Sequence, residues 1–286
     1  MANHVRHQVP ADAKAPSDKP YFSHSLARGL QVIKAFDHDA PVLRITDVAQ
    51  RTGLTRAAAR RFLMTLVDLE YVGTSDGLFY LRPRALEIGY SYLASINADR
   101  MIQPFLNELT DITRESSSFA VLDGFDIRLI ARSASNRMLN YTIHLGGRVP
   151  AYGTSLGRML MAALPPDQFD AHWHSLPARL PTVSGTLDKD EFRQSVERAR
   201  AEDFTVIEDR HGQGVASIAV PVRDKSGTVI AAINVVEYPP KSTAKAMQRK
   251  FLGRLRDAAH QIGEALDASR HVITGGMRQM PQPPLG

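Results

Sequence analysis

The sequence contains no cysteine and a single tryptophan in 286 residues. The absence of cysteine excludes disulfide bonds, cysteine-based zinc sites and thiol chemistry. No stretch approaches the roughly eighteen consecutive apolar residues that a membrane-spanning helix needs, and residues 1–20 lack the apolar core of a signal peptide. We therefore expect a cytoplasmic protein with no membrane partner.

The positive charge is concentrated in one short stretch. The chain carries a formal net charge of +5, and residues 41–61 hold five arginines against one acid, which gives that stretch +4. Residues 101–270 hold 21 basic and 20 acidic residues and so have no electrostatic reason to bind nucleic acid. The charge pattern favours DNA binding near the N-terminus.

Residues 44–72 are typical of two short helices joined by a glycine turn. Thr46 or Asp47 begins the first helix, because either side chain accepts from free N–H groups at a helix start. Gly53 ends that helix, since glycine readily adopts the left-handed conformation, and Thr55 caps the next helix.

The second helix has an apolar side and a basic side. The apolar side is Leu54, Ala58, Ala59, Phe62, Leu63 and Leu66, and the other side is Arg56, Ala57, Arg60, Arg61 and Met64. Small alanines beside arginines let a helix approach the major groove closely, where guanidinium groups reach phosphates or guanine edges. We expect DNA contacts from Thr46, Thr55, Arg56, Ala57, Arg60 and Arg61. The alternative is a solvated arginine face on an ordinary helix pair.

The segment after the basic helix favours DNA binding. Two β-prone runs, 71–73 and 78–81, flank an Asp-Gly turn and predict a β-hairpin wing. Residues 24–37 supply a further helix before the pair. The sequence therefore predicts a winged helix-turn-helix domain over 23–83, after a disordered tail at 1–22.

Residues 84–100 are predicted to form a linker and dimerisation helix. Leu86, Gly89, Tyr90, Leu93 and Ile96 recur at helical spacing, and the small first domain offers this apolar side no partner. Packing against a second copy of the chain is one interpretation. Packing on the C-terminal domain of the same chain is the other.

Residues 101–270 predict an α+β domain with a mainly antiparallel sheet covered by helices, before a second disordered tail at 271–286. The expected helices are 101–116, 154–164, 167–175, 188–202 and 243–268. The expected strands are 118–123, 127–133, 138–144, 204–208, 215–222 and 228–236.

Two patterns suggest other chemistry. Gly153-Thr154-Ser155-Leu156-Gly157 matches the nucleophile elbow of serine hydrolases, but loop residues precede it where an elbow needs a buried strand. The second pattern is a possible metal cluster of Asp167, Asp170, His172 and His174. On a helix His172 and His174 point about 200° apart and cannot share an ion. We expect no catalytic residue, no metal site and no cofactor.

The order of these motifs resembles the IclR family of bacterial transcription regulators across about residues 22–270. The resemblance is carried by the winged helix, the linker, GGRVPAYGTSLGRMLMA and SIAVPVRDKSGTVIAAINV. GLTRAAARRFLMTL and YGTSLGR look most like the branch regulating protocatechuate and 4-hydroxybenzoate breakdown. The resemblance implies a dimer or tetramer on a palindromic operator in double-stranded DNA. It also implies a GAF-like C-terminal domain that binds a small carboxylate effector.

The family pocket, carried over position by position, falls on nine residues. They are Met138, Tyr141, Val149, Ser155, Leu156, Ile207, Ser217, Asn234 and Val236. The C-terminal family signature is partly kept: its usual Gly falls on Asp203, its Asp on Ile207 and its Glu on Arg210. The site is thus less acidic than in relatives that bind very small oxoacids.

The residues themselves agree with a carboxylate ligand. Thr154 begins a helix, and the free N–H groups near Ser155 and Leu156 favour an anion. Arg137, Arg148 and Tyr152 lie nearby in sequence and are candidate charge or hydroxyl partners. An aromatic acid such as 4-hydroxybenzoate or protocatechuate fits apolar walls beside such groups. One alternative is a constitutive DNA binder with a vestigial sensor domain. The other is a serine esterase that uses Gly153-Thr154-Ser155-Leu156-Gly157 as its nucleophile elbow.

Overall fold

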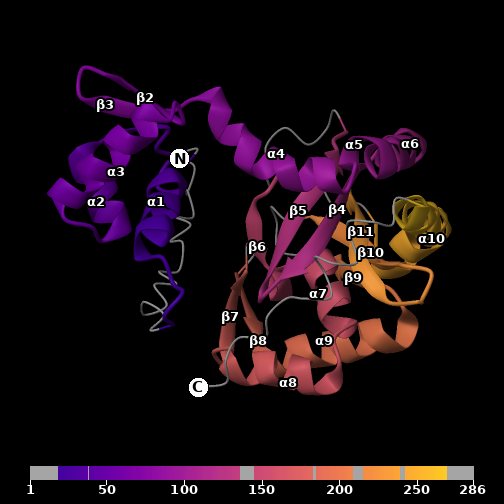
Figure 1. Cartoon of the computed structure of the whole chain (residues 1–286). Helices are drawn as coiled ribbons and strands as arrows, with labels where there is room; N and C mark the ends of the chain where they lie inside the picture. Colours follow the sequence, from indigo (N-terminus) through magenta and orange to yellow (C-terminus); the bar gives the residue numbers. More distant parts are fainter. Residues whose placement is uncertain are drawn as a thin grey trace. The chain divides into compact units, whose positions relative to one another are not determined.

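The computed structural model describes residues 19–37, 39–135, 145–182, 185–208, 215–238 and 242–268. The chain divides into two compact units, an N-terminal unit of residues 1–88 and a C-terminal unit of residues 89–286 (Figure 1). The predicted tails lie largely outside the described residues. So do the whole predicted strand 138–144 and the predicted site residues Arg137, Met138, Tyr141 and Arg210.

The N-terminal unit is a winged helix. Its elements are α1 (His24–Lys34), β1 (Val42–Arg44), α2 (Ile45–Thr52), α3 (Arg56–Asp68), β2 (Val72–Ser75) and β3 (Leu78–Leu81). The strands form a sheet in the order β1-β3-β2. Val32, Val48, Ala59, Leu63 and Phe79 are buried in its core. The sequence did not indicate β1, which is only three residues long.

The turn residues act as their chemistry predicts. Gly53 ends α2 with φ +67°, and the Thr55 side chain accepts from the Ala58 N–H as the cap of α3. Asp76 and Gly77 both have positive φ, which is the backbone that a two-residue hairpin turn needs. The helix α2 begins at Ile45, slightly before Thr46, because the Asp47 carboxylate accepts from the Arg44 N–H at 2.8 Å.

The predicted linker helix is interrupted. A 3₁₀ turn, η1 (Pro83–Ala85), precedes α4 (Leu86–Ser95), and α5 (Ala98–Met101) follows after a break at Asn97, whose φ is +48°. A second break at Ile102 separates α5 from α6 (Gln103–Thr113), so the predicted helix 101–116 is also shorter. The break allows Ile96, Ala98 and Ile102 to be buried together in the core of the C-terminal unit.

Six of the described strands of the C-terminal unit form an antiparallel sheet in the order β6-β5-β4-β11-β10-β9. They are β4 (Ser116–Asp123), β5 (Asp126–Ser133), β6 (Arg148–Pro150), β9 (Thr205–Glu208), β10 (Ala216–Arg223) and β11 (Val229–Glu237). A separate hairpin pairs β7 (Arg179–Thr182) with β8 (Gly185–Asp188). Neither β6 nor this hairpin was predicted from the sequence.

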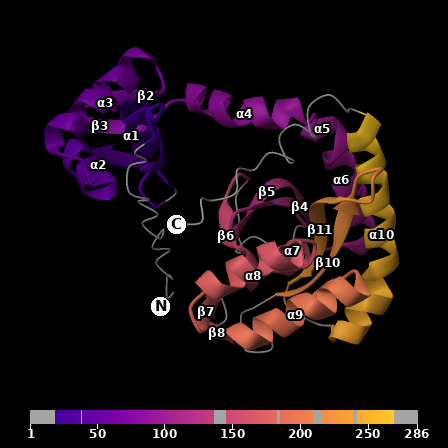
Figure 2. The same cartoon turned by 60° about the horizontal axis from the view of Figure 1, so that its bottom comes forward.

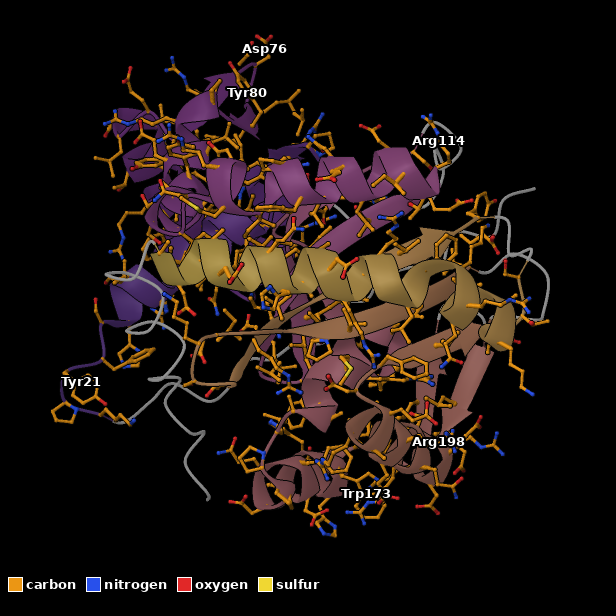
Figure 3. All side chains as sticks on the ribbon, turned by 90° about the vertical axis from the view of Figure 1, so that its right-hand side faces the viewer. Tyr21, Asp76, Tyr80, Arg114, Trp173 and Arg198 are labelled. Carbon is orange, nitrogen blue, oxygen red and sulfur yellow. The ribbon has the colours of Figure 1, made fainter. Side chains whose placement is uncertain are left out.

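Helices cover both faces of this sheet (Figure 2). The first face packs against α6 and α10 (Ala244–Ala268), and Figure 3 views α10 crossing it. The second face packs against α7 (Ser155–Ala162), with α8 (Pro166–Ser175) and α9 (Lys189–Glu202) beyond. A 3₁₀ turn, η2 (Ala151–Gly153), leads into α7. The fold is α+β, as predicted.

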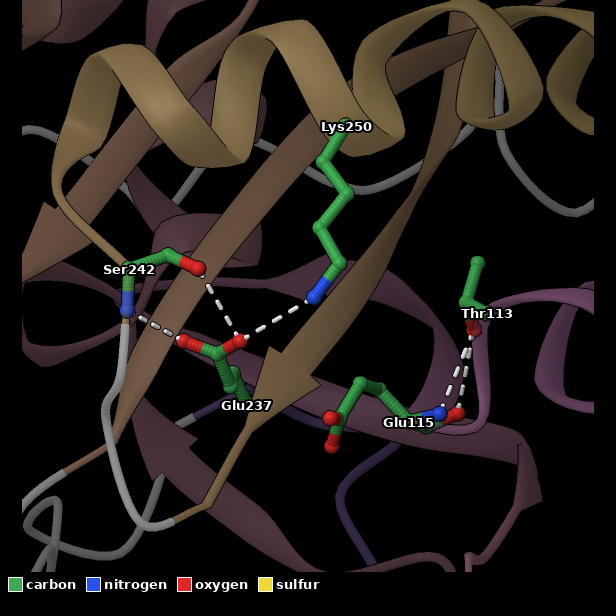
Figure 4. A network of polar contacts seen from close by, with 5 residues as sticks. All are labelled: Thr113, Glu115, Glu237, Ser242 and Lys250. Carbon is green, nitrogen blue, oxygen red and sulfur yellow. Dashed lines mark hydrogen bonds and ion pairs between the residues drawn. The ribbon is translucent and has the colours of Figure 1, made fainter.

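A buried carboxylate fixes the start of α10 (Figure 4). Glu237, at the end of β11, is 1% exposed and accepts from the Ser242 N–H at 2.7 Å and the Ser242 hydroxyl at 3.0 Å. Lys250 on α10 places its Nζ 3.5 Å from the same carboxylate. These bonds join the end of β11 to α10 and hold the helix on the first face.

Among the described residues, no helix is both long and apolar enough to cross a membrane.

Candidate functional site

The basic helix α3 exposes the side predicted to face DNA. Arg56, Ala57, Arg60 and Arg61 are exposed, whereas Ala59 and Leu63 are fully buried. Thr46 is exposed on α2, and the Thr55 hydroxyl oxygen caps α3. Met64 is an exception, because it packs against the core of the N-terminal unit. The exposed surface of α3 is therefore basic, with small side chains between the arginines.

The start of α7 lies on the second face of the sheet. The N–H groups in the first turn of a helix have no helical carbonyl partner. Here the Thr154 hydroxyl accepts from the Gly157 N–H at 2.9 Å, and the N–H groups of Ser155 and Leu156 belong to the same turn. Ser155 is 1% exposed, and its Oγ accepts from Asn234 Nδ2 at 3.5 Å. Asn234 Oδ1 is buried and accepts no hydrogen bond from the described residues.

The second face carries a row of paired residues on five neighbouring strands. Arg132 on β5 pairs with Ser118 on β4, and Ser118 pairs with Asn234 on β11. Asn234 then pairs with Ala219 on β10, which pairs with Thr205 on β9. A parallel row contains Ser116, Val236, Ser217 and Ile207. Since paired residues share a face, these side chains lie on the α7 side of the sheet.

Several predicted effector residues come together there. Ser155 contacts Asn234, and Ile207, Ser217 and Val236 are cross-strand neighbours. Val149 and Leu156 pack in the core beside α7. The second face therefore has a buried polar centre near the start of α7, bordered by apolar side chains.

Two other predicted residues have structural partners. Arg148 is exposed at the sheet edge and forms an ion pair with Asp126 at 2.5 Å. The Tyr152 ring packs edge-on against Phe192, 6.3 Å between centroids, and burial together with Asp126 raises its pKa. Contact of either residue with an effector stays a prediction.

Comparison with known families decides what kind of protein carries these two sites. The model of the IclR helix-turn-helix domain matches residues 25–76, and the model of the bacterial transcriptional regulator IclR C-terminal region matches residues 90–264. The chain belongs to the IclR family. It is therefore a DNA-binding transcriptional regulator with an effector-binding C-terminal unit, and not an enzyme.

Curated members of the IclR family resemble it over most of their length. The chain is 38% identical to the Pca regulon regulatory protein of Pseudomonas putida, over 85% of each chain. It is 33% identical to the p-hydroxybenzoate hydroxylase transcriptional activator of Acinetobacter baylyi, over 83% of this chain and 89% of that protein. The branch of the IclR family that the motifs suggested is confirmed.

Solved structures of similar chains support the fold. A protein from Rhodococcus sp. RHA1, described as a transcriptional regulator, is 39% identical with a TM-score of 0.75, over 86% of this chain and 99% of that one. The inducer-binding domain of an Acinetobacter PobR double mutant, in complex with 3-hydroxybenzoic acid, is 30% identical with a TM-score of 0.51. That match covers 56% of this chain and 94% of the domain.

The enzyme pattern and the metal pattern both lie at or on helices of this IclR member. The strand before Ser155 is the three-residue β6, and the described partner of the Ser155 hydroxyl is an asparagine. Asp167, Asp170, His172 and His174 lie on α8, which is helical as expected. Among the described residues, no group of three or more potential ligands could hold a metal ion.

Part of the polar surface on the second face was not predicted from the sequence. Ser116, Ser118 and Thr205 are buried polar residues on this face, and Arg132 is half-buried beside them. The strand patterns placed three of these positions, but only the strand order shows that β4 and β11 are neighbours. The alternation of Ser117 and Ser118 within one strand was the available signal.

Proposed function

We propose that this IclR regulator binds a small aromatic carboxylate on the second face of the C-terminal sheet and thereby controls genes for aromatic acid catabolism. The buried polar centre carries the proposal: the Ser155 hydroxyl, at the start of α7, lies 3.5 Å from Asn234 Nδ2, and the buried Asn234 Oδ1 has no partner among the described residues. Buried polar groups without partners are costly unless a ligand or water satisfies them. The names of the relatives and the PobR complex support an aromatic acid.

We further propose that the DNA partner is a double-stranded operator, read in the cytoplasm by α3 and the β2–β3 wing of a homo-oligomer. The basic exposed side of α3 supports the contact with DNA. Leu86, Ile88, Tyr90 and Tyr92 on α4 are between 43% and 74% exposed, which supports a second copy of the chain as their partner. Dimer and tetramer are both compatible with this face.

Effector binding changes DNA affinity only if the ligand favours one arrangement of the oligomer over another. The helix α4 spans the boundary between the two units, from Leu86 to Ser95. It is therefore the element through which a change in the C-terminal unit reaches the DNA-binding unit. A constitutive binder would show no such coupling.

Thermal unfolding of the full chain tests the effector. We expect 4-hydroxybenzoate and protocatechuate to raise the melting temperature, and succinate to leave it unchanged, because a ligand at about 100 times its Kd stabilises by about 2.7 kcal/mol. Ser155→Ala should reduce the shift. Ser195→Ala is the matched control, since the buried Ser195 hydroxyl donates to Phe192 O within α9. If no ring acid shifts the wild-type melting temperature, the sensor proposal fails and the constitutive binder replaces it.

A further inference from the structure

We infer that an ionic joint centred on Glu70 binds the end of the DNA-reading helix α3 to the start of α4 and transmits changes between the two helices. The Glu70 joint consists of Glu70, Tyr71, Arg82, Arg84 and Glu87, all within the N-terminal unit. Its part in the response to an effector rests on the proposed function, whereas the joint itself can be tested without an effector.

Glu70 follows α3 in a backbone conformation that glycine usually supplies. Its N–H donates to Val67 O at 2.9 Å, and the Tyr71 N–H donates to Leu66 O at 2.9 Å, so the two residues close the last turn of α3. The φ of Glu70 is +63°, and helices that end in this way usually have glycine there because a side chain makes the conformation unfavourable. Contacts of the long acidic side chain offset that cost.

The Glu70 carboxylate contacts the arginines on either side of Pro83. Its Oε1 lies 3.7 Å from Arg82 Nη1, and its Oε2 accepts from Arg84 Nη1 at 3.3 Å. The Arg82 N–H donates to Tyr71 O at 2.9 Å, and the Arg84 guanidinium carbon lies 5.6 Å from the centroid of the Tyr71 ring. Backbone, ionic and cation–π contacts therefore bind the end of α3 to the segment that follows β3.

Arg84 continues the joint into α4. Its Nε lies 3.5 Å from Glu87 Oε2 in the first turn of that helix, so one guanidinium contacts a carboxylate that follows α3 and a carboxylate on α4. The four charged side chains of the joint are between 47% and 63% exposed. Isolated ion pairs at such positions contribute little to stability, whereas a network of several charges contributes more. The Glu70 joint can therefore align the start of α4 and still open without unfolding either unit.

The other end of α4 is held by apolar burial. Leu93 packs against the core of the C-terminal unit, and Ile96, directly after the helix, is 4% exposed in that core. Apolar burial is not screened by salt, unlike an exposed ion pair. A change in α4 that begins in the C-terminal unit therefore acts on the Glu70 joint, and through Glu70 on the last turn of α3.

Hydrogen exchange of the full chain, followed by mass spectrometry, tests the joint directly. Glu70→Gln keeps the length of the side chain and removes its charge. We expect this variant to raise exchange in peptides that cover residues 82–88 about fivefold, because the joint protects the hydrogen-bonded amides of Arg82 and Ala85.

Asp68→Asn is the matched control for that measurement. It removes the same charge from an exposed position at the end of α3, and Asp68 has no ion pair in the described part of the chain. Exchange at residues 82–88 should stay at the wild-type rate in this variant.

DNA binding tests transmission without an effector. Coupling between two sites is reciprocal, so DNA bound at α3 should slow exchange at residues 82–90. The probe is saturating DNA from upstream of the protein's own gene. We expect at least about threefold slower exchange in the wild type and in Asp68→Asn, and a change of less than about 1.5-fold in Glu70→Gln.

The effector response is measured as the ratio of the Kd values for that DNA with and without 4-hydroxybenzoate. Glu70→Gln should bring this ratio at least about halfway to one on a logarithmic scale, with the Kd for 4-hydroxybenzoate within about twofold of wild type by calorimetry. Arg84→Gln should have the same effect. The double variant should lose no more than either single variant, because both substitutions open one joint.

The possible outcomes separate the joint from the proposed effector. Equal exchange at residues 82–88 in Glu70→Gln and Asp68→Asn would overturn the joint. Wild-type protection by DNA in a loosened Glu70→Gln would overturn transmission, and an unchanged ratio of Kd values in that variant would overturn its part in the effector response. A wild type whose DNA affinity responds to no ring acid would instead overturn the proposed effector, while the exchange measurements still decide the joint.

Discussion

The exposed arginines of α3 have no acidic partner among the described residues. Arg56, Arg60 and Arg61 are exposed, and no described carboxylate lies within ion-pair distance of them. Arg51, on α2, differs, because it pairs with Asp37 at 2.7 Å and donates to Ala35 O. Within this motif, Arg51 is bound to other parts of the fold, whereas the three exposed arginines have donors available for the predicted contacts with phosphates and bases.

Removing one of these guanidinium groups should weaken operator binding. If the contact is bidentate to guanine, we expect Arg56→Ala or Arg60→Ala to reduce the binding free energy for operator DNA by about 1–3 kcal/mol. If the contact is to a phosphate, we expect its loss to lower the slope of log affinity against log salt concentration by about one. Mobility shifts on DNA from upstream of the protein's own gene measure both quantities. Arg254→Ala, exposed on α10, is the control. Wild-type affinity in both α3 variants would contradict the role given to this helix.

The burial or exposure of a single side chain can be predicted where its position along one helix decides which side it faces. The 100° period of a helix separates Ala59 and Leu63 from Arg60, whatever the rest of the fold does. Met64 departs from that pattern because a long flexible side chain turns toward the core. The polar row on the second face could not be found in this way, since Ser118 on β4 lies beside Asn234 through strand pairing and not through nearness in sequence.

At the scale of elements, the start of α7 depends on a close backbone approach. A Cβ on Gly157 would meet the backbone of Ala151 in η2, whereas a Cβ on Gly153 would meet nothing within 4 Å. This contact fixes where α7 begins, and therefore where the free N–H groups of Ser155 and Leu156 point.

The two glycines provide a matched test of that contact. Gly157→Ala should destabilise the C-terminal unit by about 1–3 kcal/mol, because backbone must shift to admit the methyl group. Gly153→Ala should change the unfolding free energy by less than about 0.5 kcal/mol. Urea denaturation followed by circular dichroism measures both. Equal stabilities of the two variants would show that the approach of η2 to α7 does not constrain the helix start.

Element boundaries follow the sequence less closely than element types do. The apolar period through residues 84–100 has no turn signal, yet the chain breaks at Asn97 in the left-handed conformation. The break is tertiary in origin, because it lets Ile96 and Ile102 enter one core. The strand β6 and the β7–β8 hairpin have three or four residues per strand, too few for an alternating pattern to be distinguished from a loop.

At the scale of the whole molecule, the alternation of side chains along the strands gives the two faces of the sheet different neighbours. Ile233 and Val235 of β11 pack against the α6 and α10 layer, while Asn234 between them faces α7. The α+β class could be predicted because helices and hairpin-paired strands were visible in sequence. The strand order could not, since pairing β4 with β11 joins segments separated by more than a hundred residues.

Association of two chains should depend on α4. Tyr90 is 60% exposed and Leu86 is 74% exposed, so a charge placed there enters the proposed contact between copies. We expect Tyr90→Glu to lower the mass measured by light scattering to that of a smaller oligomer or a monomer, with unchanged helix content. Ile112→Glu, at a 49% exposed position on α6, is the control. An unchanged mass for Tyr90→Glu would exclude α4 as the contact.

The single tryptophan gives the molecule a spectroscopic asymmetry. Trp173 lies on α8 in the C-terminal unit (Figure 3), with Lys189 Nζ 4.3 Å and the Arg193 guanidinium 4.4 Å from its ring centroid. Its indole N–H donates to Lys189 O at 3.3 Å. All indole emission therefore originates in the sensor half, and melting of the winged helix alone leaves that emission unchanged. Comparing emission with helix content during denaturation shows directly whether the two units unfold together or in succession.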